Sequence, residues 1–245
     1  MGALHKGHFS LIDSCKKKCK KTLVSIFVNP SQFNNKNDYK NYPLNLPKDL
    51  KILKKMNVNY VFIPKVKEIY KNKKNTKINI HPHEKVLCAK YRKGHFEGVL
   101  DVMGRLTNLV NPKKIFMGKK DYQQYFLIKN YLKNKYKTSI IPCKTIRDKS
   151  KIALSSRNNH LDLNRIKKAS FLSKSLIKLK RNLVNSKKIK QNLRIQIKYF
   201  EKLLKIKIEY LELRSIKNLK ISNTVRGSRL FVAYYIDNVR LIDNF

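Results

Sequence analysis

Strand and helix signals alternate through the first two thirds of this 245-residue chain. The segment TLVSIFV at 22–28 is β-branched and aromatic and ends at Asn29-Pro30, whereas apolar residues in 99–110 recur at helical spacing. Strands alternating with helices predict a parallel sheet with helices on both faces. The predicted strands are 22–28, 58–63, 113–117 and 137–143, with a short one at 77–81, and the predicted helices are 9–20, 46–56, 99–110 and 121–134.

The pattern changes after about residue 160. Two Lys-rich amphipathic helices, 162–182 and 187–205, precede three strand-like stretches at 208–213, 229–236 and 239–242. Gly227-Ser228 and Asp237-Asn238 are turn signals between these strands. This order is typical of an α+β unit, so we expect an α/β domain over 1–160 and a smaller α+β domain over 161–245.

The chain is strongly basic, with a formal net charge of +42. Its 46 Lys, 25 Asn and 24 Ile share AT-rich codons, so base composition explains the charge better than selection does. The alternative is a nucleic-acid-binding protein, since clustered Lys neutralises phosphates. Lys is spread along the whole chain without an aromatic-interleaved motif, so we expect only weak, salt-sensitive polyanion binding and no specific nucleic acid.

Other compositional features narrow the class of protein. No run of about 18 apolar residues is present, and MGALHKGHFS lacks the charged start and apolar block of a secretory signal, so we expect neither a membrane span nor a leader. The four cysteines, Cys15, Cys19, Cys88 and Cys143, include no C-x-x-C pair, which disfavours a zinc ribbon. The helical spacing of Cys15 and Cys19 predicts a buried face, and a reduced, cytoplasmic protein is expected.

The segment HKGH, from His5 to His8, precedes a predicted helix. Amides at a helix N-terminus attract phosphate oxygens, and Gly7 permits close approach of a phosphate to the backbone. Imidazoles can hydrogen-bond that phosphate and, when protonated, offset its charge. The motif is short, and two surface histidines without a role are the alternative.

Three further segments carry polar groups suited to a nucleotide or a carboxylate. MGKKDYQQ (117–124) and VNPSQF (28–33) each follow a strand, at the sheet edge where open α/β folds bind ligands. ALSSRN (153–158) joins two hydroxyls to a guanidinium that can clamp a triphosphate. The simpler alternatives are an N-cap at Asp121 and ordinary turns at the other two segments. Walker and G-x-G-x-x-G motifs are missing, so side chains and helix N-termini would bind phosphate.

Taken in order, these segments resemble the pantothenate synthetase (pantoate–β-alanine ligase) family. The matching segments are MGALHKGH, VSIFVNPSQF, YKNYPLNLPKD, GHFEGV, MGKKDYQQ, ALSSRN, EYLEL and RLIDN. The resemblance implies a Rossmann-like ATP- and pantoate-binding domain over 1–160 and an AMP-forming ligase, a homodimer in the cytoplasm. Pantoate would attack ATP to give pantoyl adenylate and pyrophosphate, and β-alanine would then release AMP. Magnesium would accompany the ATP.

The resemblance also implies roles for residues at matching motif positions. Those expected to be catalytic are His5, His8, Lys120, Ser155 and Arg157, with His8 as the acid-type group. Those expected to bind ATP are Met1, Gly2, Ala3, Leu4, His5, Lys6, Gly7, His8, Gly118, Lys119, Lys120, Asp121, Ile146, Leu154, Ser155, Ser156 and Arg157. Gln32 and Gln124 are expected to bind pantoate, Gln32 also to bind β-alanine, and Asp49 to lie near the metal. Arg92 and His95 match a segment bordering the site.

The chain also departs from the family pattern. The family usually has about two dozen residues and a sheet strand before the position of Met1, so either the start is misassigned, or the sequence is truncated, or the fold lacks a central strand of the sheet. Lys119, Cys88 and Ser31 replace a usual Glu, Glu and Met, and Ser150-Lys151 replaces an Asp-Gly turn. None of these changes removes a residue expected to be catalytic. The alternatives to an active ligase are another adenylate-forming enzyme on this fold, a basic nucleic-acid-binding protein and a truncated, inactive homologue.

Overall fold

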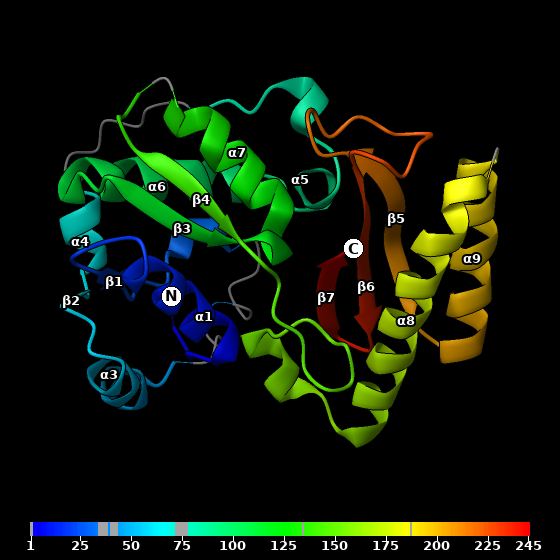
Figure 1. Ribbon diagram of the computed structural model, residues 1–245, viewed down its shortest axis with the longest axis horizontal. Helices are drawn as coiled ribbons and strands as arrows, with labels where there is room; N and C mark the ends of the chain where they lie inside the picture. The colour runs from blue at the N-terminus through cyan, green and yellow to red at the C-terminus, as the bar shows by residue number, and fades with distance from the viewer. Residues whose placement is uncertain (1, 34–38, 40–43, 72–77, 134, 187) are drawn as a thin grey trace. The chain divides into compact units, whose positions relative to one another are not determined.

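A computed structural model describes residues 2–33, 39, 44–71, 78–133, 135–186 and 188–245 (Figure 1). The chain forms two compact units, one of residues 1–85 and 89–146, the other of 86–88 and 147–245. The α/β class with parallel strands is confirmed. A division into folding domains at 160/161 stays a prediction. None of the helices among the described residues combines the length and apolar character that a bilayer span requires.

The first unit contains two pairs of parallel strands. β1 (Leu23–Ser25) pairs with β2 (Tyr60–Phe62), and β3 (Lys114–Gly118) pairs with β4 (Ser139–Cys143). Among the described residues, no hydrogen-bonded ladder joins the two pairs into one sheet. The described part of the chain thus supplies no strand between them. The helices are α1 (Lys6–Lys16), α3 (Leu46–Lys55), α4 (Val66–Ile69), α5 (Cys88–Tyr91), α6 (His95–Val110) and α7 (Tyr122–Lys133).

Local sequence explains where these helices begin and end. Asn45 caps α3 by accepting the Lys48 N–H at 3.1 Å, and Pro47 stands in the first turn. Asn111, in the left-handed conformation with φ 46°, ends α6 just before Pro112. In Figure 1, α1 lies on one side of the β3–β4 pair and α7 on the other, so helices cover both faces of this pair.

Several details of the first unit differ from the sequence-based expectations, among them helix α5, which the sequence did not predict. Residues 78–81, expected in a strand, carry none, and residue 77 lies outside the described residues. The short helix α4, with Glu68 accepting the Lys65 N–H at 2.6 Å, was not predicted. Helix α1 ends at Lys16, so Cys19 lies beyond it and does not continue the buried face of the helix.

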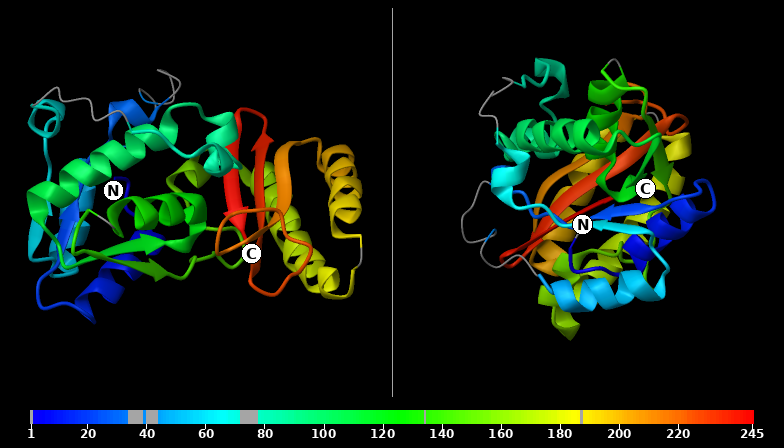
Figure 2. Two further views of the ribbon diagram at one scale, coloured as in Figure 1. Left: turned by 90° about the horizontal axis from the view of Figure 1, so that it is seen from above. Right: turned by 90° about the vertical axis from the view of Figure 1, so that its left-hand side faces the viewer.

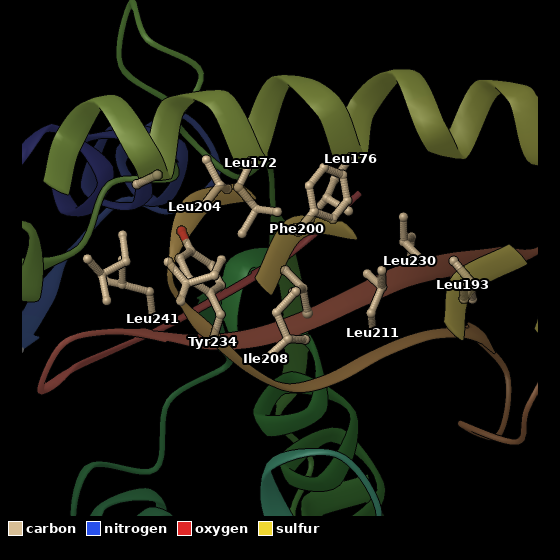
Figure 3. Close-up of a cluster of buried hydrophobic side chains, with 14 of the residues drawn as sticks. Leu172, Leu176, Leu193, Phe200, Leu204, Ile208, Leu211, Leu230, Tyr234 and Leu241 are labelled. Atoms are coloured by element: carbon tan, nitrogen blue, oxygen red, sulfur yellow. The ribbon is translucent and has the colours of Figure 1, made fainter. Parts of the chain in front are cut away.

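The second unit is an antiparallel sheet with two helices packed on it. Helices α8 (Leu163–Asn182) and α9 (Ile189–Leu204) precede β5 (Lys207–Ser215), β6 (Ser228–Ile236) and β7 (Val239–Asn244), in the sheet order β5-β6-β7. Figure 2 shows both helices beside this sheet. The predicted helices and strands are confirmed to within a few residues. The side chains that fill the space between helices and sheet include Leu172, Leu176, Phe200, Leu204, Leu211, Leu230 and Tyr234 (Figure 3).

Candidate active site

The two imidazoles of the HKGH segment lie at the N-terminus of α1. His5 is the N-cap, and its Nδ1 accepts the N–H of Gly7 at 3.1 Å. The N–H of His5 is in turn donated to Nδ1 of His8 at 3.3 Å, and the ring centroids are 4.0 Å apart. Because each Nδ1 is an acceptor, the proton of each neutral ring is on Nε2. The helix start therefore presents two Nε2–H donors beside its own backbone amides.

Both imidazoles are neutral in the free protein at neutral pH. Burial, followed by repulsion from His5 when that ring is protonated and from Lys120, lowers the pKa of His8 to about 3. Burial and the charge of Lys120 also lower the pKa of His5, and Asp121 opposes this effect. The surroundings of these rings thus disfavour another cation, and an anion would meet hydrogen-bond donors and a fixed positive charge.

The stability of the fold is expected to fall as the pH drops below neutrality. The pKa of His8 is about 3 in the folded chain against 6.5 ordinarily, so the unfolded state takes up the proton first. The stabilisation is complete above about pH 6.5 and is lost progressively toward pH 3, by at most about 5 kcal/mol. Urea unfolding of the wild type and of His8→Gln at about pH 7 and about pH 4 measures this loss. Equal pH dependence in the two proteins would contradict the prediction.

Residues after β3 join this cluster. The strand ends at Gly118, and a 3₁₀ turn, η3 (Lys119–Asp121), leads directly into α7. Lys120 Nζ lies 3.7 Å from Asp121 Oδ1, and the charge of Lys120 acts on both His5 and His8. The structure therefore brings His5, His8, Lys120 and Asp121 together at the carboxyl end of a parallel strand, where α/β proteins bind ligands.

Gln32 is held through its backbone by α6 and the residues before it. The carbonyl oxygen of Gln32, in the 3₁₀ turn η1 (Pro30–Gln32), lies 2.7 Å from Nδ1 of His95, and Arg92 donates to the same oxygen at 3.4 Å. Arg92 also lies 2.8 Å from Nε2 of His95. Because a guanidinium only donates, Nε2 must accept and Nδ1 must carry the proton donated to Gln32. These contacts use the backbone of Gln32 and do not engage its side-chain amide.

A second set of contacts fixes the same turn. Asn29 donates to Ser31 Oγ at 2.7 Å and to the carbonyl of Gly98 at 3.3 Å. Tyr70 donates to Asn29 Oδ1 at 2.9 Å. The sequence places Asn29 in VNPSQF and Gly98 in GHFEGV, but it does not indicate Tyr70 or the contacts by which these three residues support the Gln32 turn. The Asn-Pro signal at 29–30 marked a turn but not this network.

Gly98→Ala is expected to destabilise the protein, because a Cβ would lie 2.5 Å from the carbonyl oxygen of Ser31. The backbones of α6 and η1 would have to separate, at a cost of roughly 1–3 kcal/mol. Gly118→Ala is the matched control, since a Cβ there meets nothing within 4 Å. Thermal unfolding checks both variants. A similar Tm in Gly98→Ala and wild type would contradict the close packing.

The two glutamines of MGKKDYQQ have different environments. Gln123 is buried, accepts the Ala89 N–H at 3.4 Å and donates to the Glu84 carbonyl at 3.2 Å. Gln124, the residue expected to bind pantoate, is half-buried in the first turn of α7. The neighbouring glutamine therefore has a structural role, and the binding role of Gln124 stays a prediction.

The ALSSRN segment belongs to the second unit. Ser155 caps the 3₁₀ turn η4 (Ser156–His160) by accepting the Arg157 N–H at 3.3 Å, and Asn158 donates to the Ala153 carbonyl at 3.1 Å. Arg147, which sequence analysis missed, bridges to Ala153 in an isolated antiparallel pair. Closure of this segment over a nucleotide, and the ATP contacts of Ile146 and Leu154, stay predictions.

Lys151→Gly is expected to raise the stability of the turn that precedes this segment. Lys151 has φ 71°, and its N–H is donated to the Asp148 carbonyl at 3.1 Å. The left-handed conformation destabilises a residue with a Cβ by about 1 kcal/mol, and Gly removes this strain. Gly also raises the conformational entropy of the unfolded chain, which offsets part of the gain. We expect a net gain of roughly 0.5 kcal/mol in urea unfolding. Lys149→Gly, at a neighbouring exposed lysine without positive φ, should show no gain.

Asp49, expected near the metal, does not fit a magnesium ligand. Its side chain is 1% exposed, and Oδ1 accepts the Leu4 N–H at 2.8 Å. Mg²⁺ keeps several waters when bound by proteins, and so deep a carboxylate leaves them no room. No group of three His, Cys, Asp or Glu side chains suited to a metal occurs within the described residues. Met1, expected to line the ATP site, lies outside the described residues.

Comparison with known proteins gives a single consistent result. The family model described as Pantoate-beta-alanine ligase matches residues 1–245. A pantothenate synthetase from Leptospira interrogans is 41% identical over 250 residues, which cover 100% of this chain and 87% of that protein. One from Pseudothermotoga lettingae is 37% identical over 251 residues, covering 100% and 88%.

Two solved structures with a similar fold are also described as a pantothenate synthetase or a pantoate-beta-alanine ligase. The pantothenate synthetase of Thermus thermophilus superposes with a TM-score of 0.92 at 31% identity, covering 100% of this chain and 90% of that one. The pantoate-beta-alanine ligase of Francisella tularensis, solved with beta-gamma ATP and beta-alanine, gives 0.83 at 38% identity, covering 100% and 86%.

Proposed function

The chain belongs to the pantoate–β-alanine ligase family, and we propose that it joins its substrates through a pantoyl adenylate made beside the start of α1. As a member of this family it is an ATP-dependent enzyme that condenses pantoate with β-alanine. The observation that supports the site is the juxtaposition of His5, His8 and Lys120. Two neutral donors, a fixed cation and the amides of a helix N-terminus suit a triphosphate.

In the first step the carboxylate of pantoate attacks the α-phosphorus of ATP and pyrophosphate leaves. Negative charge grows on the phosphate oxygens, and the Nε2–H groups of His5 and His8 would donate hydrogen bonds to them while Lys120 supplies the positive charge. In this proposal the imidazoles are neutral hydrogen-bond donors in the free enzyme, whereas the sequence analysis also considered protonated imidazoles. Ser155, Ser156 and Arg157 would also contact the nucleotide.

In the second step the amine of β-alanine attacks the acyl carbon, and AMP leaves. Holding the adenylate makes this step effectively unimolecular. The amides of Gln32 and Gln124 would orient pantoate, and Gln32 would also contact β-alanine. We assign Mg²⁺ to the phosphates of the incoming ATP, since Asp49 does not fit it. We also propose a Rossmann-like nucleotide-binding arrangement for 1–160, a homodimer, and a cytoplasmic location suited to the free thiols.

The test is AMP formation from ATP, Mg²⁺ and pantoate, with and without β-alanine. We expect AMP only when both the acid and the amine are present. Exchange of labelled pyrophosphate into ATP should require pantoate but not β-alanine, because only the adenylate step is reversed. Exchange without pantoate, or AMP formation with an unrelated acid at the same rate, would overturn the assignment.

A nucleic-acid-binding role predicts a different result. Tight binding of RNA or DNA that survives moderate salt would favour it, whereas a Lys-rich enzyme should lose nearly all binding as salt rises. A salt titration with a labelled duplex of random sequence distinguishes the two.

A further inference from the structure

The turn that leads into α1 is conformationally strained. Ala3 has φ 48°, in the left-handed region where a residue with a Cβ is disfavoured by about 1–2 kcal/mol. Such a conformation persists only where its surroundings impose it. Two residues later His5 begins the hydrogen-bond chain to His8. The orientation of both imidazoles therefore depends on the contacts that fix Leu4, which lies between Ala3 and His5.

Leu4 is held at two points. Its side chain is 8% exposed and packs in a cluster with Ile12, Ile26 and Leu53. Its backbone N–H is donated to Oδ1 of Asp49, which reaches it from the first turn of α3. Because the Asp49 side chain is 1% exposed, this bond is shielded from competing water. The second oxygen, Oδ2, is buried and has no hydrogen-bond partner among the described residues.

We propose that Asp49 is a positioning residue, which fixes the Leu4 amide and thereby aims the Nε2–H donors of His5 and His8. This rests on the proposed function for its catalytic consequence. The connection runs from Asp49 Oδ1 to Leu4 N–H, along one peptide to His5, and from His5 N–H to His8 Nδ1. A shift of about 1 Å at a catalytic donor can cost roughly 10²-fold in rate. A buried carboxylate that accepts a backbone N–H from a strained turn is suited to prevent such a shift of the imidazole donors.

Two substitutions separate positioning from metal binding. Asp49→Asn removes the charge but keeps an Oδ1 that can accept the Leu4 N–H, whereas Asp49→Ala removes the acceptor. We expect kcat for AMP formation to fall roughly 10- to 100-fold in Asp49→Ala and to stay within about threefold of wild type in Asp49→Asn. The Mg²⁺ concentration for half-maximal rate should be unchanged in Asp49→Asn. A rise in that concentration, with Asn as damaging as Ala, would overturn the proposal in favour of a metal ligand.

Ile52→Ala is the matched control for loss of packing. Ile52 lies on the same helix and packs against the same cluster, but its apolar side chain has no hydrogen-bonding group to offer the turn. It should lower Tm but reduce kcat, measured well below Tm, far less than Asp49→Ala does, because the hydrogen bond between Asp49 and the Leu4 N–H is retained. If Asp49→Ala lowers Tm but leaves kcat unchanged, Asp49 is merely structural and the proposal fails.

A spectroscopic readout does not depend on turnover. The ¹⁵N shifts of the imidazole nitrogens report the Nε2–H tautomer of His5 and His8. These shifts should change in Asp49→Ala and be retained in Asp49→Asn and Ile52→Ala. Unchanged shifts in Asp49→Ala would contradict the positioning role. Absence of AMP formation by the wild type would instead count against the proposed function, and the imidazole shifts would still decide the role of Asp49.

Discussion

Replacing His8 by Asn is expected to lower the rate of AMP formation by roughly 10²- to 10⁴-fold while leaving the fold almost intact. The Oδ1 of Asn can take the place of Nδ1 and accept the N–H of His5, which preserves the start of α1. It offers no donor where Nε2 stood. The adenylation step would therefore lose a hydrogen bond to the charged phosphate, while the hydrogen bond that caps α1 is kept.

His8→Gln is the complementary variant. Its amide can place a donor near the former Nε2 but supplies no acceptor for the N–H of His5. We expect Gln to retain more activity than Asn and to unfold at lower temperature. Kinetics and thermal unfolding of both variants, in parallel, test the assignment of the two ring nitrogens. Activity near that of the wild type in His8→Asn would show that the outward donor is not used.

Arg147→Met is expected to destabilise the second unit by about 3–5 kcal/mol. The guanidinium makes a two-point contact with Asp243, Nη1 to Oδ2 at 2.5 Å and Nη2 to Oδ1 at 2.9 Å, and Nη2 also donates to the Asn244 carbonyl at 3.2 Å. It stacks over the ring of Phe245, 4.6 Å from its centroid. Asp243 is 8% exposed, so removing Arg147 would take two charge-assisted hydrogen bonds away from a buried carboxylate.

The double variant Arg147→Met/Asp243→Leu decides the cause of that loss. An apolar pair of similar volume can replace a buried ion pair with little net cost, so most of the stability should return. Urea unfolding of the two single variants and the double variant measures the coupling. If the double variant is as unstable as Arg147→Met, the effect comes from the packing of Arg147 on Phe245 rather than from the lost ion pair with Asp243.

The helices and strands with strong local periodicity were predictable from sequence. Helix α9 buries one face, strand β6 is buried along nearly its whole length, and the turn residues Gly227 and Asp237 have positive φ where the sequence indicated turns. Strands β1 and β2 are only three residues long, because pairing and not propensity decides how far a short strand extends. Helix α4 and the absence of a strand at 78–81 were not indicated by the hydrophobic periodicity.

The candidate site also has a part that was predictable from sequence and a part that was not. His5 and His8 are close in sequence, so their cluster could be expected from the HKGH segment alone. The supports of the site join residues far apart in the chain: Asp49 and Leu4 are 45 positions apart, Tyr70 and Asn29 are 41 apart, and Arg147 and Asp243 are 96 apart. No local pattern marks such pairs. The sequence alone could not show that Asp49 is buried, because its burial depends on where α3 packs.

The chain length between paired strands also predicts the order in which the strands pair during folding. β6 and β7 pair across the two-residue turn Asp237-Asn238, whereas Leu23 pairs with Tyr60 and Lys114 with Ser139, so the parallel pairs must close far longer loops. Hairpins form in about 1–10 μs, and longer closures carry a larger entropic barrier. During refolding, amide protons of β6 and β7 should therefore gain protection from exchange before those of β1 and β3. The first unit, which is synthesised first, would be among the last parts of the chain to acquire its paired strands.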